Sequence, residues 1–298
     1  MSELPATEQQ NPRSERLDEM SVESVLGLMN QEDRDVPGAV AEALPEIRSA
    51  VELLVEGWRK GGRWIYVGAG TSGRIAALDA AECPPTFGAP ADRILALIAG
   101  GPQALLRAVE GAEDDRAAAV RDLDDLSPGS SDTVIGLAAS GRTPYVTAAI
   151  DHAGHAGCAT VGVANNAGSE LARLAQVGIE IPTGPEMITG STRLKAGTSQ
   201  KLVLNMLSTT AFTLLGKVYG NQMVDVQATN EKLRRRARRI VEQTLDVSES
   251  QAEELLRSAD GSVKVALIMA KANVSAKKAH RLLNDAAGSM RRSLAAPE

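Results

Sequence analysis

Short apolar runs alternate with helix-like segments through the middle of the chain. Each run is five or six residues long and is rich in β-branched or other apolar residues. Strands that alternate with helices in this way build a parallel sheet with helices on both faces. The predicted strands are Trp64–Gly68, Ile94–Ile98, Thr133–Ala138, Ala159–Ala164 and Val177–Pro182.

The segments on either side of these runs read as helical. Apolar residues recur at helical spacing in Ser21–Asn30 and Val40–Arg59, whereas residues 1–20 are polar and predict a loose arm. A long helical pattern follows Leu194 to about Tyr219, and then the basic helix 230–245, whose charges favour a solvated or subunit-bridging face. Three short amphipathic patterns come after Asp246 and predict a small helical bundle.

The predicted fold class is therefore α/β, a three-layer sandwich around a five-stranded parallel sheet, with a small C-terminal helical bundle. We expect an N-terminal helical arm at 1–55, a ligand-binding sheet domain at 56–222, and C-terminal helices at 223–298. Sheets of this kind bind ligands at the carboxyl ends of their strands. The turns that follow the strands are thus the places to look for a site.

The first of these turns, in "WIYVGAGTSGR", leads from the first strand into a helix. Gly68, Gly70 and Gly73 fit the dinucleotide fingerprint G-x-G-x-x-G, and backbone N–H groups at a helix start bind anions. A dinucleotide site also needs an acidic residue near the end of the second strand, but that strand ends "ALIAGGPQ". The hydroxyls of Thr71 and Ser72 suit a compact phosphate monoester better.

A second hydroxyl-rich turn, "AASGRTPYV", follows the third strand. Ser140, Gly141, Arg142 and Thr143 stand at the mouth of the next helix. A capped helix start would explain either turn alone. Two such turns on one sheet could converge on a single phosphate, which backbone N–H groups and helix dipoles would also stabilise.

A third polar cluster lies in "GPEMITGSTRLKAGTSQK", residues 184–201. It is dense in hydrogen-bond donors and opens an otherwise apolar helix, which favours a polar sugar as ligand. The alternative is a capped helix with solvated cations. The candidate substrate-binding residues of this block are Glu186, Ser191, Arg193 and Lys195.

Two groups of carboxylates are candidates for acid–base work. Glu82 is predicted in the last turn of the first helix after the sheet begins, just before Pro84, where the helix macrodipole favours the protonated form of a carboxyl. A group that stays protonated suits a general acid. The other acids cluster in "AVEGAEDDR", where Gly111 interrupts the helical pattern, and their spacing does not say which one faces a pocket.

Composition restricts the ligand to a small molecule. A formal net charge of -6 and 2% aromatic residues argue against nucleic acid as a partner. Two cysteines and three histidines at no metal-ligand spacing predict neither a disulfide framework nor a metal site. The N-terminus lacks a signal peptide's apolar core, and the longest apolar stretch is shorter than a membrane span. We therefore expect a cytoplasmic protein without a membrane partner.

Several long motifs resemble one family closely, the bacterial N-acetylmuramic acid 6-phosphate etherases, which are sugar isomerase (SIS) domain proteins. The resemblance extends from about Asn11 into the C-terminal helices, and block 184–201 resembles a signature shared with the glucokinase regulatory protein. The motifs are "VGAGTSGR", "AAECPPTFG", "IAGG", "VEGAEDD", "AASGRTPYV", "GPEMITGSTRLKAGTSQKLVLNMLSTT" and "GKVYGNQMVDVQATNEKL".

This resemblance implies a cofactor-free, metal-independent lyase that cleaves the lactyl ether of a phosphosugar during cell-wall recycling. It implies Glu82 and Glu113 as the two acid–base residues, with the first turn holding or shaping the pocket for a sugar 6-phosphate. The predicted helix-end placement of Glu82 favours it as proton donor, which leaves Glu113 as base. It also implies a homodimer with its pocket near the subunit interface. Two other functions stay open, an aldose–ketose isomerase of the same fold and a non-catalytic sugar-phosphate sensor.

Overall fold

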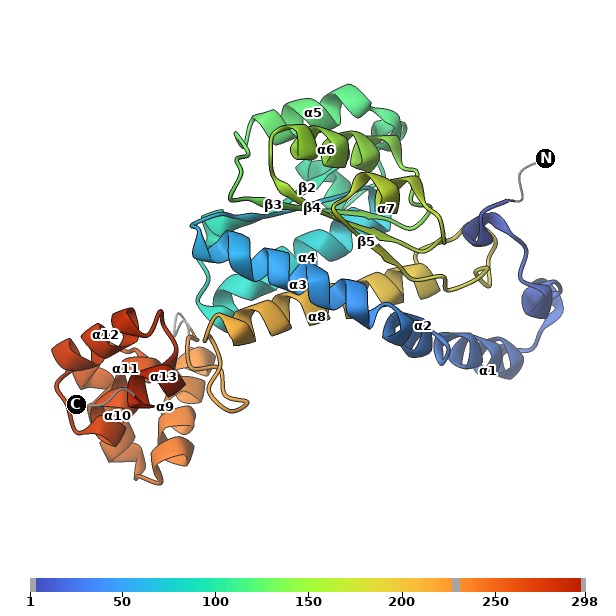
Figure 1. Ribbon diagram of the computed structural model, residues 1–298. Helices are drawn as coiled ribbons and strands as arrows, with labels where there is room; N and C mark the ends of the chain where they lie inside the picture. The colour runs from blue at the N-terminus through green and yellow to red at the C-terminus, as the bar shows by residue number, and fades with distance from the viewer. Residues whose placement is uncertain (1–3, 227–230, 296–298) are drawn as a thin grey trace. The chain divides into compact units, whose positions relative to one another are not determined.

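The computed structural model describes residues 4–226 and 231–295. Within these residues the strands form one parallel sheet in the order β2-β1-β3-β4-β5, as Figure 1 shows. The strands are β1 (Trp64–Gly68), β2 (Ile94–Ile98), β3 (Thr133–Ala138), β4 (Ala159–Ala164) and β5 (Val177–Glu180). The predicted strands and fold class are thus confirmed, and β5 ends two residues before the predicted Pro182.

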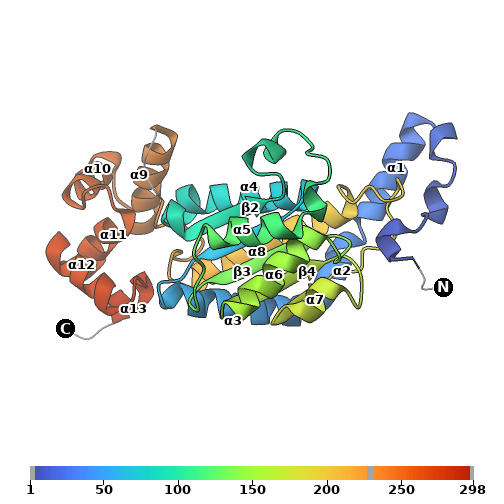
Figure 2. The ribbon, with the colours of Figure 1, turned by 90° about the horizontal axis from the view of Figure 1, so that it is seen from above.

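Helices cover both faces of this sheet (Figures 1 and 2). One face packs against α5 (Arg116–Asp124), α6 (Pro144–His155) and α7 (Glu170–Leu174), and the other against α3 (Leu44–Arg59) and the sheet-side parts of α4 (Gly70–Phe87) and α8 (Lys195–Leu214). The helices α1 (Val22–Asp33) and α2 (Val36–Glu42) precede α3.

Strand β1 is buried along its whole length and supplies side chains to both layers. Ile65 and Val67 pack in one cluster with residues of α6. On the opposite face, Trp64 Nε1 donates to the Leu54 carbonyl of α3 at 3.1 Å, and the Tyr66 hydroxyl donates to Asp79 of α4 at 2.9 Å. This alternation follows from the two-residue period of a strand.

The N-terminal segment is docked rather than loose, so this expectation was wrong. Thr7 is fully buried, its N–H donates to Asn166 Oδ1 at 3.3 Å, and Asn166 Nδ2 donates to its hydroxyl at 2.9 Å. Ser14 donates to the Met187 carbonyl at 2.8 Å. Hydrogen bonds to the carboxyl edge of the sheet hold this segment in place. Such bonds cannot be predicted from the pattern of hydrophobic residues along the chain.

The chain divides into two compact units. The first comprises residues 1–80 and 92–208, and so combines the predicted arm with the sheet. The second comprises residues 81–91 and 209–298, and α4 and α8 contribute residues to both units. The boundaries predicted at 55/56 and 222/223 differ from these divisions, and as functional domains they stay predictions.

The second unit holds the predicted C-terminal bundle. Its core is apolar and includes Val241, Ala266 and Leu267, all fully buried. Lys264 is buried and its Nζ lies 2.7 Å from Asp225 Oδ2. The helices are α9 (Glu231–Leu245), α10 (Glu249–Ser258), α11 (Val263–Ala272), α12 (Ala276–Asp285) and α13 (Met290–Ala295). Asn230, the predicted start of the basic helix, lies outside the described residues.

None of the described helices is both long enough and apolar enough to cross a membrane. The longest, α8, has twenty residues and includes Lys195, Lys201 and Asn205.

A buried ion pair fixes the start of β1 beside that of β3. Asp132 accepts the Arg63 backbone N–H at 2.7 Å, the Arg63 Nη2 at 2.6 Å and the Gly129 N–H at 3.0 Å. Burial alone would raise the pKa of the Asp132 carboxyl, but the bonds from Arg63 and Gly129 hold this pKa below its ordinary value.

We expect Asp132→Asn to lower the free energy of unfolding by about 1.5–3 kcal/mol at neutral pH, because charge-assisted bonds are lost. A depressed pKa stabilises the fold above the ordinary value of about 3.9, and the contribution is lost as pH falls through the folded pKa. Urea unfolding at several pH values should show the gap to wild type closing below about pH 4. The exposed Asp125→Asn serves as control, and a gap that does not depend on pH would contradict the assignment.

Candidate active site

Three turns meet at one edge of the sheet because their strands are in register. Gly68, the last residue of β1, pairs with Ile98 of β2 and with Leu137 of β3. After β1 the chain forms β2 on one side of it, and later crosses over to form β3 on the other side. Ligands of doubly wound sheets bind at such a switch point, outside the carboxyl ends of the strands.

A cavity of about 210 Å³ lies at this edge. Its walls come from the start of α4, the turn after β2 and the segment before α5. Two predicted site residues, Gly70 and Glu113, line it together. The full lining is Ala69, Gly70, Arg74, Ala99, Ala104, Ala108, Val109, Glu110, Gly111, Ala112 and Glu113.

Gly111 decides which acids of the cluster face this cavity. Its φ of +70° turns the chain into a short 3-10 helix, Ala112–Asp114, so that Glu110 and Glu113 both line the cavity. Asp115 instead accepts the Ala118 N–H at 2.8 Å and caps α5. The structure thereby narrows the candidates that the sequence left open to two.

The first turn ends earlier than predicted, because α4 already begins at Gly70. A Cβ on Gly68 would lie 2.6 Å from the Gly73 nitrogen, so the turn needs glycine for its close approach to the helix. Ser72 is 8% exposed, while Thr71 is half-buried. The first N–H groups of a helix have no partner within it, so the start of α4, which follows β1 directly, is a place where an anion would be stabilised.

In the second turn, one of the two hydroxyl side chains makes no capping bond to the backbone. Ser140 Oγ accepts the Arg142 N–H at 3.2 Å, as in an ordinary capped turn. Thr143 is the N-cap of α6 but makes no side-chain capping bond. The capped-helix alternative therefore does not account for Thr143. In the same turn, Arg142 is exposed and Gly141 is buried.

The third cluster separates into a buried part and an exposed part. Glu186 is fully buried and its carboxylate accepts the N–H groups of Lys195 and Ala196 at 3.0 and 2.9 Å. Burial raises the pKa of Glu186 although these two N–H groups act in the opposite direction. Ser191 is half-buried and Arg193 exposed.

Lys195 takes part in a buried network with the N-terminal segment. Its Nζ lies 2.6 Å from Glu32 Oε2, and Glu32 also receives bonds from Asn11 at 2.9 Å and from Arg13 at 2.8 Å. Burial alone would raise the pKa of Glu32, but these partners hold this pKa below its ordinary value. Substrate binding by Glu186 and Lys195 stays a prediction, and their observed contacts hold the chain together.

The helix-end argument for Glu82 was wrong. Helix α4 continues through Pro84 and Pro85 to Phe87, and the Gly88 N–H closes it on the Pro84 carbonyl at 2.9 Å. A proline inside a helix removes a backbone hydrogen bond and crowds the preceding turn, yet α4 contains both prolines. Glu82 is exposed and belongs to the second unit, whereas Glu113 belongs to the first.

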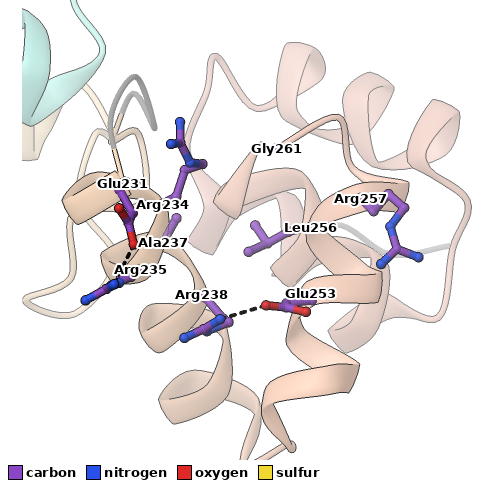
Figure 3. A pocket seen from close by; sticks show the side chains of 9 residues that line it. All are labelled: Glu231, Arg234, Arg235, Ala237, Arg238, Glu253, Leu256, Arg257 and Gly261. Atoms are coloured by element: carbon purple, nitrogen blue, oxygen red, sulfur yellow. Dashed lines mark hydrogen bonds and ion pairs between the residues drawn. The ribbon is translucent and has the colours of Figure 1, made fainter.

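A larger hollow, of about 510 Å³, lies between α9 and α10 in the second unit (Figure 3). Arg235 pairs there with Glu231 and Arg238 with Glu253. The described residues that line it include no hydroxyl side chain. These ion pairs fit the solvated basic face expected from the sequence, and the hollow offers no acid–base chemistry of its own.

Curated relatives share nearly the whole length of this chain. An N-acetylmuramic acid 6-phosphate etherase of Pasteurella multocida (strain Pm70) is 52% identical over 97% of this chain and 96% of that protein. One of Mycolicibacterium smegmatis (strain ATCC 700084 / mc(2)155) is 52% identical over 97% of both. The chain belongs to the N-acetylmuramic acid 6-phosphate etherase family.

Domain families agree with membership in this etherase family. The glucokinase regulatory protein N-terminal SIS domain matches residues 46–154, the SIS domain matches 115–210, and the C-terminal lid domain of glucokinase regulatory protein matches 220–282. An E. coli CFT073 protein in complex with A5P aligns at a TM-score of 0.50 and 19% identity, over 68% of this chain and 97% of that one. Phosphoheptose isomerase of Neisseria gonorrhoeae aligns at a TM-score of 0.50 and 16% identity, over 64% of this chain and 98% of that one. These structures share the fold.

The sequence reading of this etherase-family chain missed Arg74. It lines the same cavity as Glu113, one turn into α4. The helix macrodipole disfavours a cation near a helix N-terminus. The unfavourable position of Arg74 was therefore the sequence feature that could have indicated a functional role.

We expect Lys195→Met to lower the free energy of unfolding by about 3–5 kcal/mol, because it leaves the buried Glu32 charge without its main partner. The double variant Glu32→Gln/Lys195→Met should recover part of this loss in urea unfolding. Lys201→Met, on the same helix but less buried, is the control. Wild-type stability with weakened phosphosugar binding would instead favour the substrate-binding role.

Proposed function

We propose that this chain cleaves the D-lactyl ether of N-acetylmuramic acid 6-phosphate, giving N-acetylglucosamine 6-phosphate and D-lactate. The observation that supports it most is the cavity in which Glu113 and the start of α4 meet at the switch point of the sheet. A base and an anion-binding helix start in one pocket suit proton abstraction from a phosphosugar. The 52% identity to etherases over nearly the whole chain supports the same substrate.

The reaction needs two carboxyl groups in different protonation states. In the open-chain aldehyde, the Glu113 carboxylate removes the proton at carbon 2, next to the carbonyl. The bond between carbon 3 and the ether oxygen then breaks, and the Glu82 carboxylic acid protonates the departing lactate. Water then adds its hydroxyl at carbon 3 and gives up a proton to Glu82, while Glu113 returns its proton to carbon 2. Both glutamates regain their starting states, so the sum is ether plus water to sugar phosphate plus lactate.

The choice of Glu113 over Glu110 rests on the motif "GAEDD", since both residues line the cavity. The 6-phosphate would be held by the two hydroxyl-rich turns, through Gly70, Thr71 and Ser72 and through the second turn. In that turn the uncommitted Thr143 hydroxyl is the strongest candidate. The other members proposed there are Ser140, Gly141 and Arg142, and in the third cluster Ser191 and Arg193.

The proposed assembly is a homodimer with the pocket near the subunit interface, working in the cytoplasm without metal or nucleotide. Among the described residues no group of three or more His, Cys, Asp or Glu could hold a metal ion. An isomerase of the same fold or a sugar-phosphate sensor would bind similar ligands. Neither would release lactate.

Purified protein treated with EDTA should release one D-lactate for each N-acetylglucosamine 6-phosphate formed, measured enzymatically and by mass spectrometry. We expect no dependence on added nucleotide, because the first turn has no acidic partner for a ribose. Phosphosugar binding without lactate release would favour the sensor, and an aldose–ketose conversion would favour the isomerase.

The two glutamates can be separated in deuterated water by following the proton at carbon 2 by NMR. Glu113→Gln should lower kcat by about 10²–10⁴ and abolish exchange of this proton, because abstraction comes first. Glu82→Gln should stall lactate release while exchange continues. Asp114→Asn, next to the base but outside the cavity lining, is the matched control. Exchange that survives in Glu113→Gln and is lost in Glu110→Gln would transfer the base role to Glu110.

A further inference from the structure

The proposed substrate brings a second anion close to the reacting bond. Its lactyl carboxylate is joined through one carbon to the ether oxygen on carbon 3, and carbon 3 is bonded to carbon 2, where the base acts. A group that binds this carboxylate must therefore lie in the same cavity as the base. The phosphate, at the far end of the sugar, needs a different set of donors.

That cavity already contains two carboxylates, Glu110 and Glu113. A third one would be repelled there unless a cation offsets it, since like charges a few ångström apart repel one another. Among the described residues that line the cavity, Arg74 is the one cationic side chain.

One hydrogen bond orients the guanidinium of Arg74 through the nitrogen nearest its stem. Its Nε donates to the Leu105 carbonyl at 3.2 Å, at the end of the short 3-10 helix Pro102–Leu105. Within the described part of the chain, no carboxylate is found in an ion pair with Arg74. The two terminal nitrogens are thus the donors left over, and a guanidinium fork matches a carboxylate in a bidentate geometry.

Other cations near this edge are less suited to the task. Lys195 is buried against Glu32, and Arg142 belongs to the second turn, proposed for the phosphate. Arg107 is exposed and does not line the cavity, although it lies in the same loop.

We propose that Arg74 binds the lactyl carboxylate and so determines that the enzyme acts on lactyl ethers rather than on neutral ethers of the same sugar phosphate. This inference rests on the proposed function. Arg74 is a specificity-determining residue in this scheme, because it touches the leaving group and takes no part in proton transfer.

The test compares two substrates in the wild type and in Arg74→Gln. One substrate is the lactyl ether, and the other is its lactamide, which has the same shape without the charge. We expect Arg74→Gln to lower kcat/KM for the lactyl ether by roughly 10- to 150-fold, the loss expected from a charge-assisted contact, and to lower kcat/KM for the uncharged lactamide much less. The wild-type preference for the acid over the amide should therefore collapse.

Arg107→Gln is the control and should keep the full preference. Equal losses on both substrates in Arg74→Gln would overturn the proposal, since a role in folding, in phosphate binding or in setting the basicity of Glu113 affects both alike. A wild-type enzyme that does not prefer the acid would also overturn it. If the wild type cleaves the ether of neither substrate, so that neither lactate nor lactamide is released, the proposed function fails, and this outcome is distinct from the other two.

Discussion

The parallel pairing of β1 with both β2 and β3 is the constraint on which the site depends. The chain leaves β1 for one neighbour and returns later to the other, so the turns after these strands diverge and leave room between them. The register places Gly68 level with Ile98 and Leu137. A slip of one residue would exchange the faces of Trp64 and Ile65 and would move the first turn away from its neighbours. Packing of the core and geometry of the site are therefore fixed by the same hydrogen bonds.

Much of the fold could be read from the sequence because hydrophobic burial sets it. The five apolar runs became the five strands, and the glycine turn became the start of α4. The sequence-based predictions failed where polar or tertiary contacts determine the local structure. Thr7 and Asn11 are buried through hydrogen bonds to residues more than 150 positions away, which no local pattern reports. Pro84 and Pro85 read as a helix end, yet tertiary context keeps α4 helical around them.

The candidate site was predicted in outline for a similar reason. The site lies at the carboxyl ends of the strands, and the topology of a parallel sheet determines where these ends are. Which acid faces the cavity depends on the backbone angle at Gly111, a local geometry that the residue permits but does not dictate. Glu186 and Lys195 were predicted to bind ligand because their segment is dense in hydrogen-bond donors and opens an apolar helix. Here their partners are the N–H groups of α8 and the carboxylate of Glu32, which come together only in the folded chain.

The side chain of Asn166 joins two distant parts of the first unit. Its amide nitrogen donates to the Thr7 hydroxyl and, at 3.1 Å, to the carbonyl of Ala139, the residue before the Ser140 turn. The N-terminal segment and this turn are thus held by one amide that follows β4. During synthesis, at about 5–20 residues per second, the early segment must wait for β4 before it finds this partner. The contact that docks the N-terminus thus joins residues far apart in the sequence, and during synthesis it cannot form before β4 has been made.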